Sequence, residues 1–199
     1  MPQPDHPELT LENLRQTASR IEKYVNLTPI HRWQDPWVID QVGDGELYLK
    51  LEFLQQTGSF KARGALNNTL TRVKADRNQG VTAVSAGNHA IAVAYAAKTL
   101  GISAKVLMHR KANPFRISKC QHYGAEVILV DDITRAFALL EEIAESEDRI
   151  IIHPFDSAPT LQGTGTLGVE IGDALLNLDT ILVAVGGGGL IGGVASALK

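Results

Sequence analysis

One lysine of the sequence, Lys61, follows a small polar turn and an aromatic residue. The turn reads Thr57-Gly58-Ser59, and these residue types predict a helix that begins near Ser59 or Phe60. Lys61 then lies in the first helical turn, where free backbone N–H groups and the helix dipole disfavour an ammonium ion. A neutral amine at this position is suited to attack a carbonyl group. Taken alone, the pattern favours a solvated surface lysine, because most lysines near helix starts are solvated surface charges.

A run of glycines follows the apolar segment that ends at Val185. Without Cβ atoms the backbone can approach an anion closely, and the next helix directs N–H groups at it. Because a plain tight turn does not need four glycines, phosphate is the ligand that this loop predicts. The run also contains Gly-x-Gly-x-x-Gly, a weak sign of dinucleotide binding, whereas no Gly-Lys-Ser/Thr follows, which excludes a P-loop. The residues concerned are Gly186, Gly187, Gly188 and Gly189, followed by Leu190.

A third loop, residues 85–89, also connects a predicted strand to a predicted helix. Its backbone amides can hold a carboxylate, and the Asn88 side chain offers both a donor and an acceptor. His89 is either an acid or base or a structural histidine. Together the three loops predict pyridoxal phosphate (PLP), a cofactor that forms an imine with a lysine and then acts as an electron sink.

The elements that must position these loops become regular from Val81 onward. Strands and helices alternate there, which predicts a parallel sheet covered on both faces. Ligands bind beyond the carboxyl ends of the strands in such sheets. The predicted strands span residues 81–84, 104–108, 125–130, 150–152 and 180–185, and the predicted helices 90–100, 113–123, 133–144 and 160–176.

The first part of the chain is less regular. Thr10 can cap a helix whose apolar residues recur at helical spacing as far as Val25. Trp33 and Trp37 lie in a proline-containing segment that is predicted to be irregular, with packing as their expected role. Residues 47–51 are predicted to form a short strand.

Composition limits the possible partners. The 199 residues carry a formal net charge of -3 without a polybasic tract, so the sequence does not support nucleic-acid binding. Cys120 is the single cysteine and residues 1–8 lack a secretory signature, which together favour a reducing, cytoplasmic location. Residues 181–198 are uncharged, but their six glycines favour a buried strand, loop and helix over a membrane span.

Four segments, in the same order along the chain, resemble the threonine/serine dehydratase branch of the fold-type II PLP enzymes, the tryptophan synthase β-like family. They are residues 51–65, 85–90, 152–156 and 185–191, with weaker support from 124–127. The resemblance implies a three-layer α/β architecture. A small domain, residues 81–149, is inserted into a larger domain formed by residues 1–80 and 150–199, and the cofactor lies between them. It also implies a homodimer.

The resemblance also implies a role for each matching residue. Lys61 would be the Schiff-base lysine, Phe60 would pack against the pyridine ring, and Asn88 would hydrogen-bond the phenolic oxygen of the cofactor. The backbone N–H groups of residues 186–190 would bind the phosphate. The substrate carboxylate would be surrounded by Ser85, Ala86, Gly87 and His89. No metal ligands are implied within this chain.

The sequence departs from the family pattern in two ways. Thr164 replaces the glutamine of a Gly-Gln-Gly-Thr segment, which affects local packing or substrate fit. The chain also stops soon after the glycine loop, whereas family members continue with the Ser or Cys that faces the pyridine nitrogen and with acidic metal ligands. The chain is therefore expected to be truncated or to be one segment of an enzyme.

The activity that the resemblance implies is β-elimination of a hydroxyamino acid. Threonine would give 2-oxobutanoate and ammonia, and serine would give pyruvate and ammonia. A serine racemase is an alternative, although racemases of this family carry a second serine where this chain has Ala86. A hydroxyaspartate dehydratase, a catalytically incomplete fragment and a nicotinamide-binding domain also stay open, whereas cysteine synthase relatives usually carry threonine in place of His89.

Overall fold

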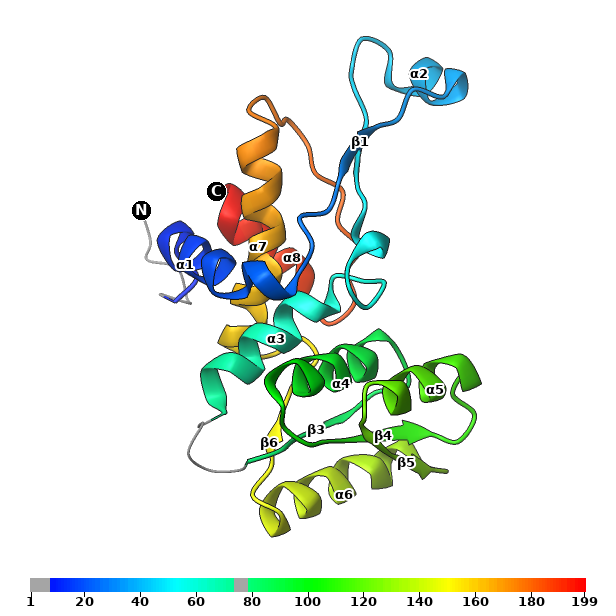
Figure 1. Cartoon of the computed structure of the whole chain (residues 1–199). Helices are drawn as coiled ribbons and strands as arrows, with labels where there is room; N and C mark the ends of the chain where they lie inside the picture. Colours follow the sequence, from blue (N-terminus) through cyan, green and yellow to red (C-terminus); the bar gives the residue numbers. More distant parts are fainter. Residues whose placement is uncertain (1–7, 74–78) are drawn as a thin grey trace.

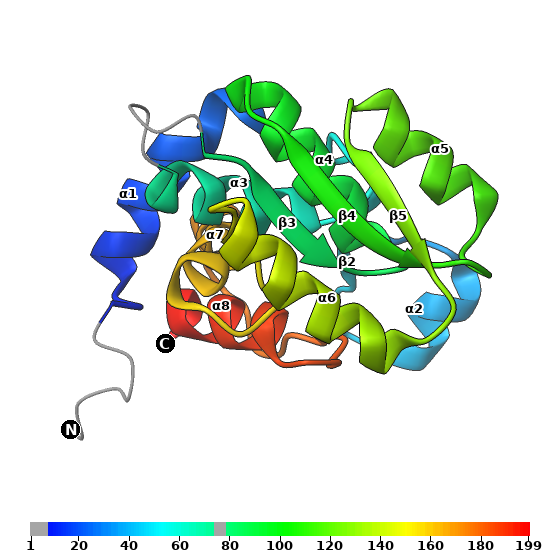
Figure 2. The same ribbon diagram turned by 90° about the horizontal axis from the view of Figure 1, so that it is seen from below.

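A four-stranded parallel sheet forms the centre of one part of the molecule, in a computed structural model that describes residues 8–73 and 79–199. Its strands lie in the order β5-β4-β3-β6, and β3 pairs with both β4 and β6. Figure 2 shows β3, β4 and β5 side by side. The parallel sheet that the alternation predicts is confirmed. The bounds are β3 Val81–Val84, β4 Ala104–His109, β5 Glu126–Val130 and β6 Ile150–Ile151.

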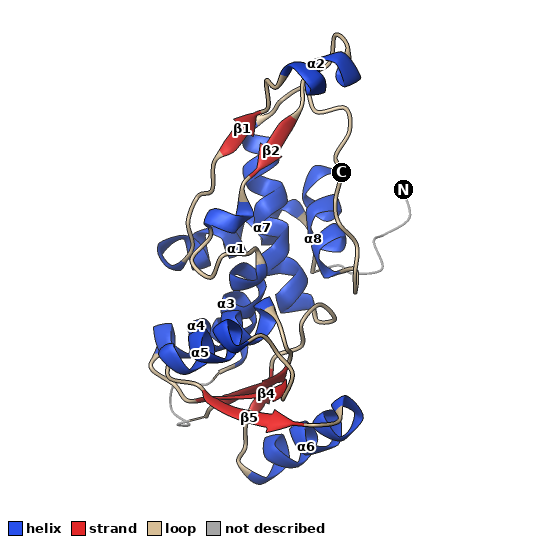
Figure 3. Ribbon diagram, turned by 90° about the vertical axis from the view of Figure 1, so that its right-hand side faces the viewer, coloured by secondary structure: helices blue, strands red, loops and turns tan. Residues whose placement is uncertain are grey.

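Helices cover both faces of this sheet (Figure 3). On one face lie α4 (Asn88–Leu100) and α5 (Pro114–His122), and on the other lies α6 (Ile133–Ser146). Local sequence explains their ends. Gly101 ends α4 in the left-handed conformation with φ 67°, and the side chain of Asp132 caps α6 by accepting from the backbone N–H of Thr134. The three-layer α/β arrangement expected from the sequence is present.

A second group of helices packs around α7 (Ala158–Ala174), as Figure 1 shows. Glycines let α7 and α8 approach closely, because a Cβ on Gly193 would lie 2.6 Å from the backbone nitrogen of Gly165. Leu14 of α1 is fully buried in this group. The remaining elements are α1 Leu11–Ile21, η1 Glu22–Tyr24, η2 Glu52–Leu54, α3 Lys61–Arg72 and α8 Gly189–Leu198.

An antiparallel pair, β1 (Ile30–Arg32) and β2 (Tyr48–Lys50), carries α2 (Pro36–Val42) at its tip (Figure 1). The strand predicted at residues 47–51 is confirmed as β2, and Trp33 lies in an irregular stretch as expected. The prediction that Trp37 lies in an irregular segment was wrong, because this residue lies in α2. Asp35 caps α2 by accepting from the backbone N–H of Trp37, and Pro36 occupies the first helical position, which its fixed φ suits. The expected packing role of Trp37 was also wrong, because this side chain is 68% exposed.

The strand predicted at residues 180–185 is absent, since this segment has no regular secondary structure. A strand needs a hydrogen-bonded neighbour, and neither sheet in the described part of the chain includes this segment. Two of its apolar side chains are correspondingly uncovered, with Leu182 88% exposed and Val185 63% exposed. The prediction of a strand at residues 180–185 was therefore wrong.

No helix in residues 8–73 and 79–199 is long and apolar enough to cross a bilayer. The expectation for the N-terminal segment concerns residues 1–8, of which residues 1–7 lie outside the described residues. The two-domain boundaries stay a prediction. β6 pairs with β3, so residues 150–151 belong to the four-stranded sheet.

Candidate active site

Lys61 is the first residue of α3, as the sequence predicted for the first helical turn. The preceding Gly58 has φ 80°, a left-handed conformation that suits glycine. Phe60 occupies the cap position and no side chain caps the helix, so the first backbone N–H groups of α3 have no side-chain acceptor. The Nζ atom of Lys61 donates a hydrogen bond to the carbonyl oxygen of Pro154 at 2.7 Å. Burial lowers the pKa of the Lys61 amine, which favours its neutral form.

Residues 152–156, the segment that connects β6 to α7, touch all three predicted loops. The Pro154 carbonyl accepts from Lys61, and the Ile152 carbonyl lies 2.8 Å from Nε2 of His89. Phe155 packs against the glycine loop, where a Cβ on Gly187 would lie 2.4 Å from its ring. The three loops, far apart in sequence, are therefore brought together by this one segment.

The glycine loop has a closed side and an open side. Gly187 and Gly189 press against Phe155, whereas a Cβ on Gly186 or Gly188 would meet nothing within 4 Å. Gly188 has φ 86° and caps α8 without a side-chain hydrogen bond. The first N–H groups of α8 thus lack intrahelical partners next to open space. Unpaired N–H groups that face open space at a helix start are the features on which an anion site depends.

The loop at residues 85–89 ends at the start of α4. Its backbone is held by Ser85, whose Oγ accepts from the backbone N–H of Gly87 at 3.1 Å. The side chain of Asn88 is exposed, and no side chain caps α4. A second helix start with free N–H groups therefore lies near Lys61, consistent with a carboxylate site. Lys61 is close enough to His89 for its charge to lower the pKa of that imidazole.

His89 is buried, with 4% of its surface exposed. Burial is the main cause that lowers the pKa of His89 to about 4. Because a carbonyl only accepts, the contact with Ile152 places the ring proton on Nε2. The imidazole is therefore neutral near pH 7, and of the two interpretations left open by the sequence the structural one is favoured.

Phe60 lies beside the lysine, with the Nζ atom of Lys61 5.1 Å from the centre of its ring. The ring is half-buried and packs against an apolar cluster from α7 and α8 that includes Leu167 and Val194. Phe60 thus connects the start of α3 to the helices behind the glycine loop. In the described residues no three His, Cys, Asp or Glu side chains form a group that could hold a metal ion.

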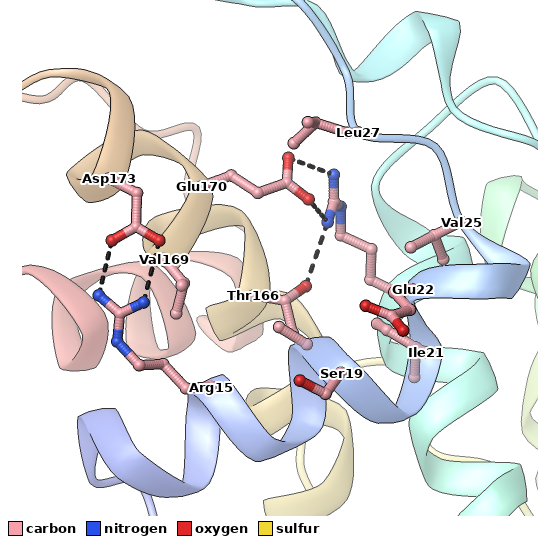
Figure 4. A pocket seen from close by; sticks show the side chains of 12 residues that line it. Arg15, Ser19, Ile21, Glu22, Val25, Leu27, Thr166, Val169, Glu170 and Asp173 are labelled. Carbon is pink, nitrogen blue, oxygen red and sulfur yellow. Dashed lines mark hydrogen bonds and ion pairs between the residues drawn. The ribbon is translucent and has the colours of Figure 1, made fainter.

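Arg63 forms a buried ion network that sequence reasoning missed. Its fully buried guanidinium donates to Glu52 at 2.9 Å and 2.8 Å and to Glu170 at 2.6 Å and 3.0 Å. Burial opposes its charge, but these hydrogen bonds outweigh that effect and raise the pKa of Arg63. Lys50 also pairs with Glu170. Figure 4 shows Glu170 and Thr166 in the wall of an adjoining 560 Å³ pocket between α1 and α7.

Two partners of Arg63, Thr166 and Glu170, are 103 and 107 residues away in sequence, so no local pattern could indicate them. The segment at residues 152–156 was noticed only as part of a family resemblance, without a role. The one available signal was a charged residue whose neighbours in the first turns of the helix, Ala62, Gly64, Ala65 and Leu66, are small or apolar. Such a residue is expected to be buried only if it is paired.

An α/β fold that joins a desolvated lysine amine to a glycine-rich helix start and a second amide loop defines the class of PLP-dependent enzymes of fold type II. The chain matches the family of pyridoxal-phosphate dependent enzymes over residues 21–199, and it belongs to this family. The cofactor predicted from the three loops, PLP, is the cofactor of the family.

Two curated relatives and one solved structure illustrate the similarity. The phenylserine dehydratase of Ralstonia pickettii is 44% identical over 181 residues, which cover 91% of this chain and 55% of the relative. The L-threonine ammonia-lyase of Thermotoga maritima is 40% identical over 192 residues, 96% of this chain and 47% of the relative. The structure of maize serine racemase superposes with a TM-score of 0.88 at 35% identity, covering 94% of this chain and 56% of that one. The chain spans about half the length of these relatives.

Proposed function

We propose that the protein containing this chain catalyses PLP-dependent β-elimination of a hydroxyamino acid, releasing ammonia and a 2-oxo acid. One observation carries the proposal. The Lys61 amine lies 2.7 Å from the carbonyl of Pro154, and the next residue, Phe155, packs against the glycine loop. The amine and the anion cradle are therefore neighbours. The names of the dehydratase and ammonia-lyase relatives support the reaction class.

Lys61 would act in two ways. Its neutral amine would attach the cofactor, and when free it would take the Cα proton of the substrate at Nζ. The lowered pKa supports both roles, because an amine must be unprotonated to do either. The Pro154 carbonyl would hold the free amine in place. PLP, when bound, supplies the electron sink for the negative charge that develops at Cα.

The two helix starts would orient the reactants. Backbone N–H groups at Gly186, Gly187, Gly188, Gly189 and Leu190 would bind the cofactor phosphate. Ser85, Ala86, Gly87 and His89 would surround the substrate carboxylate, with His89 neutral and serving to fix the start of α4. Phe60 and Asn88 would contact the cofactor ring. Orientation by fixed backbone dipoles is how such a site lowers the barrier.

Racemisation is the second candidate, favoured by the similarity to maize serine racemase. A racemase must return a proton to the opposite face of Cα. Ala86, in the loop at residues 85–89, carries no transferable proton, which supports elimination over racemisation.

The test uses protein expressed from the full reading frame and supplied with PLP. Ammonia release is measured with threonine, serine, phenylserine and hydroxyaspartate as substrates. The formation of D-serine from L-serine is measured separately. Elimination predicts ammonia from at least one substrate, with loss of more than about 1,000-fold in Lys61→Ala. Formation of D-serine without ammonia would favour the racemase. Ammonia release that persists in Lys61→Ala would contradict the proposal.

We also propose that residues 1–80 and 152–199 form part of a larger cofactor-bearing domain. Residues 81–151, which include β6 of the four-stranded sheet, would form the smaller one. An apolar groove of 590 Å³ supports an incomplete large domain. It lies between the β1–β2 pair, α7 and the unpaired segment 180–184. If the large domain is incomplete, the isolated 199-residue chain will bind a hydrophobic dye strongly and PLP weakly. Protein from the full reading frame will bind the dye weakly and PLP strongly.

A cytoplasmic homodimer completes the proposal. The single cysteine, Cys120, is buried and unpaired, which supports a reducing compartment. The helix α2 lies at the tip of the β1–β2 pair (Figure 1). Its Trp37 and Ile39 side chains are exposed, and they would form a subunit contact. Light scattering of the purified protein measures the mass directly, and a monomer at all concentrations would contradict the dimer.

A further inference from the structure

Thr164 of α7 makes a buried contact with the glycine loop. Its side chain is 2% exposed, and Oγ1 lies 2.7 Å from the carbonyl oxygen of Gly189 and 3.0 Å from that of Leu161. Carbonyl oxygens only accept, so the hydroxyl is the donor, and it has one proton. The shorter contact joins α7 to Gly189, which is the last residue of the glycine run and the first of α8.

Thr164 lies where α7 and α8 approach most tightly. A Cβ on Gly193, one turn along α8, would lie 2.4 Å from Oγ1 of Thr164 and 2.6 Å from the carbonyl oxygen of Leu161. The space around the hydroxyl is therefore filled, and the Gly189 carbonyl cannot turn away without breaking this contact.

The loop is thus fixed from two directions. The Phe155 ring supports Gly187 and Gly189 from one side, and the Thr164 hydroxyl holds the Gly189 carbonyl from α7. Gly186 and Gly188 face open space. Since a peptide unit is planar, fixing the Gly189 carbonyl also fixes the direction of the Leu190 N–H.

We infer that Thr164 is a positioning residue for the phosphate cradle, and that its hydroxyl directs the N–H groups at the start of α8. The inference rests on the proposed function, because it assigns a role at the same site. It gives Thr164, which departs from the family pattern, a specific task. A hydrogen bond of this kind is worth about 1 kcal/mol, which corresponds to roughly a fivefold change in affinity.

Three variants of the full-reading-frame protein test the inference. Thr164→Val keeps the shape and removes the hydroxyl, and Thr164→Ser keeps the hydroxyl. Thr69→Val is the matched control, because Thr69 is fully buried and its hydroxyl bonds only the Ala65 carbonyl of its own helix. The PLP dissociation constant is measured by absorbance titration. Amide hydrogen exchange at residues 188–191 is measured without cofactor.

Thr164→Val is expected to weaken PLP binding about five- to tenfold and to speed exchange at residues 188–191. Thr164→Ser is expected to stay within about twofold of the wild type, and Thr69→Val is expected to leave both quantities unchanged even if it lowers stability. The inference would be overturned if the PLP dissociation constant and the exchange rate at residues 188–191 were the same in Thr164→Val as in the wild type. It would also be overturned if Thr69→Val changed both quantities as much as Thr164→Val. If the wild type takes up no PLP, the proposed function fails, and the exchange comparison alone decides the role of Thr164.

Discussion

Lys61 and Arg63 lie two residues apart on α3, yet their cationic groups enter different surroundings. Residues at this spacing point about 200° apart around a helix, so they face nearly opposite sides. Arg63 is fully buried between two carboxylates, while Lys61 is half-buried and donates to a single backbone carbonyl. The pKa of Arg63 is raised and that of Lys61 is lowered.

The two sides of α3 also differ in how completely their polar groups are paired. Around Arg63, two cations meet two carboxylates, because Arg63 pairs with Glu52 and Glu170 and Lys50 also pairs with Glu170. Around Lys61, the buried hydroxyl of Ser59 has no hydrogen-bond partner and the glycine loop presents free helix-start amides. A fully paired region holds a fold together, whereas unpaired groups are available to a ligand. The contrast explains how one short helix can be both a structural anchor and a reactive element.

The largest expected effect is on the Arg63 side. Arg63→Met leaves buried carboxylates without their main partner and should lower the free energy of unfolding by about 3–5 kcal/mol. Arg15→Met is the matched control. It removes an arginine–carboxylate pair with Asp173 whose side chains are about half exposed, and it should cost far less stability than Arg63→Met because water screens the pair. Figure 4 shows that pair beside the same pocket. Urea unfolding measures both, and equal losses would contradict the distinction.

The next effect concerns His89, which connects the loop at residues 85–89 to the Ile152 carbonyl. Its pKa is about 4 in the folded protein and 6.5 in the unfolded chain, so the unfolded chain binds more protons between these values. Stability should therefore fall as the pH drops from about 6.5 towards 4, by about 3 kcal/mol in total. His89→Gln should remove this part of the pH dependence. An unchanged pH profile in His89→Gln would show that the imidazole is not buried in its neutral form.

The smallest effect on stability is expected for Lys61. Burial lowers the pKa of Lys61 in the folded protein, so the charged amine destabilises the folded state. This destabilisation decreases as the pH rises above the folded pKa towards the unfolded one. Lys61→Met should thus leave the free energy of unfolding at pH 7 unchanged or slightly higher, within about 1 kcal/mol. A loss as large as that of Arg63→Met would mean that the lysine is structural and would break the contrast between the two sides of α3.

Sequence predicted what local patterns determine. The four-stranded sheet followed from alternating elements, and Gly101 and Asp132 marked helix ends because their caps are formed by neighbouring residues. The same signals were present but overlooked at Asp35-Pro36, where α2 begins. The apolar segment at residues 180–185 was wrongly predicted to be a strand. A strand also requires a hydrogen-bonded neighbouring strand, and composition does not indicate whether one is present.

At the site, too, local features were predicted from the sequence and long-range contacts were not. The three loops were identified from their own residue types, since glycine runs and helix starts are local features. What connects them was not identified. The Pro154 carbonyl, the Phe155 ring and the Arg63 carboxylates act across the fold, at residues far from their partners in sequence. Thr164 was noticed only as an unusual residue, and its contact with Gly189 required coordinates.

The most direct test of the account is to locate the lysine that reacts with the cofactor. Protein from the full reading frame is incubated with PLP, reduced with borohydride to make the attachment permanent, digested and analysed by mass spectrometry. The account predicts a cofactor-modified peptide that contains Lys61, and none in Lys61→Met. Modification centred on another lysine, with Lys61 unmodified, would contradict it.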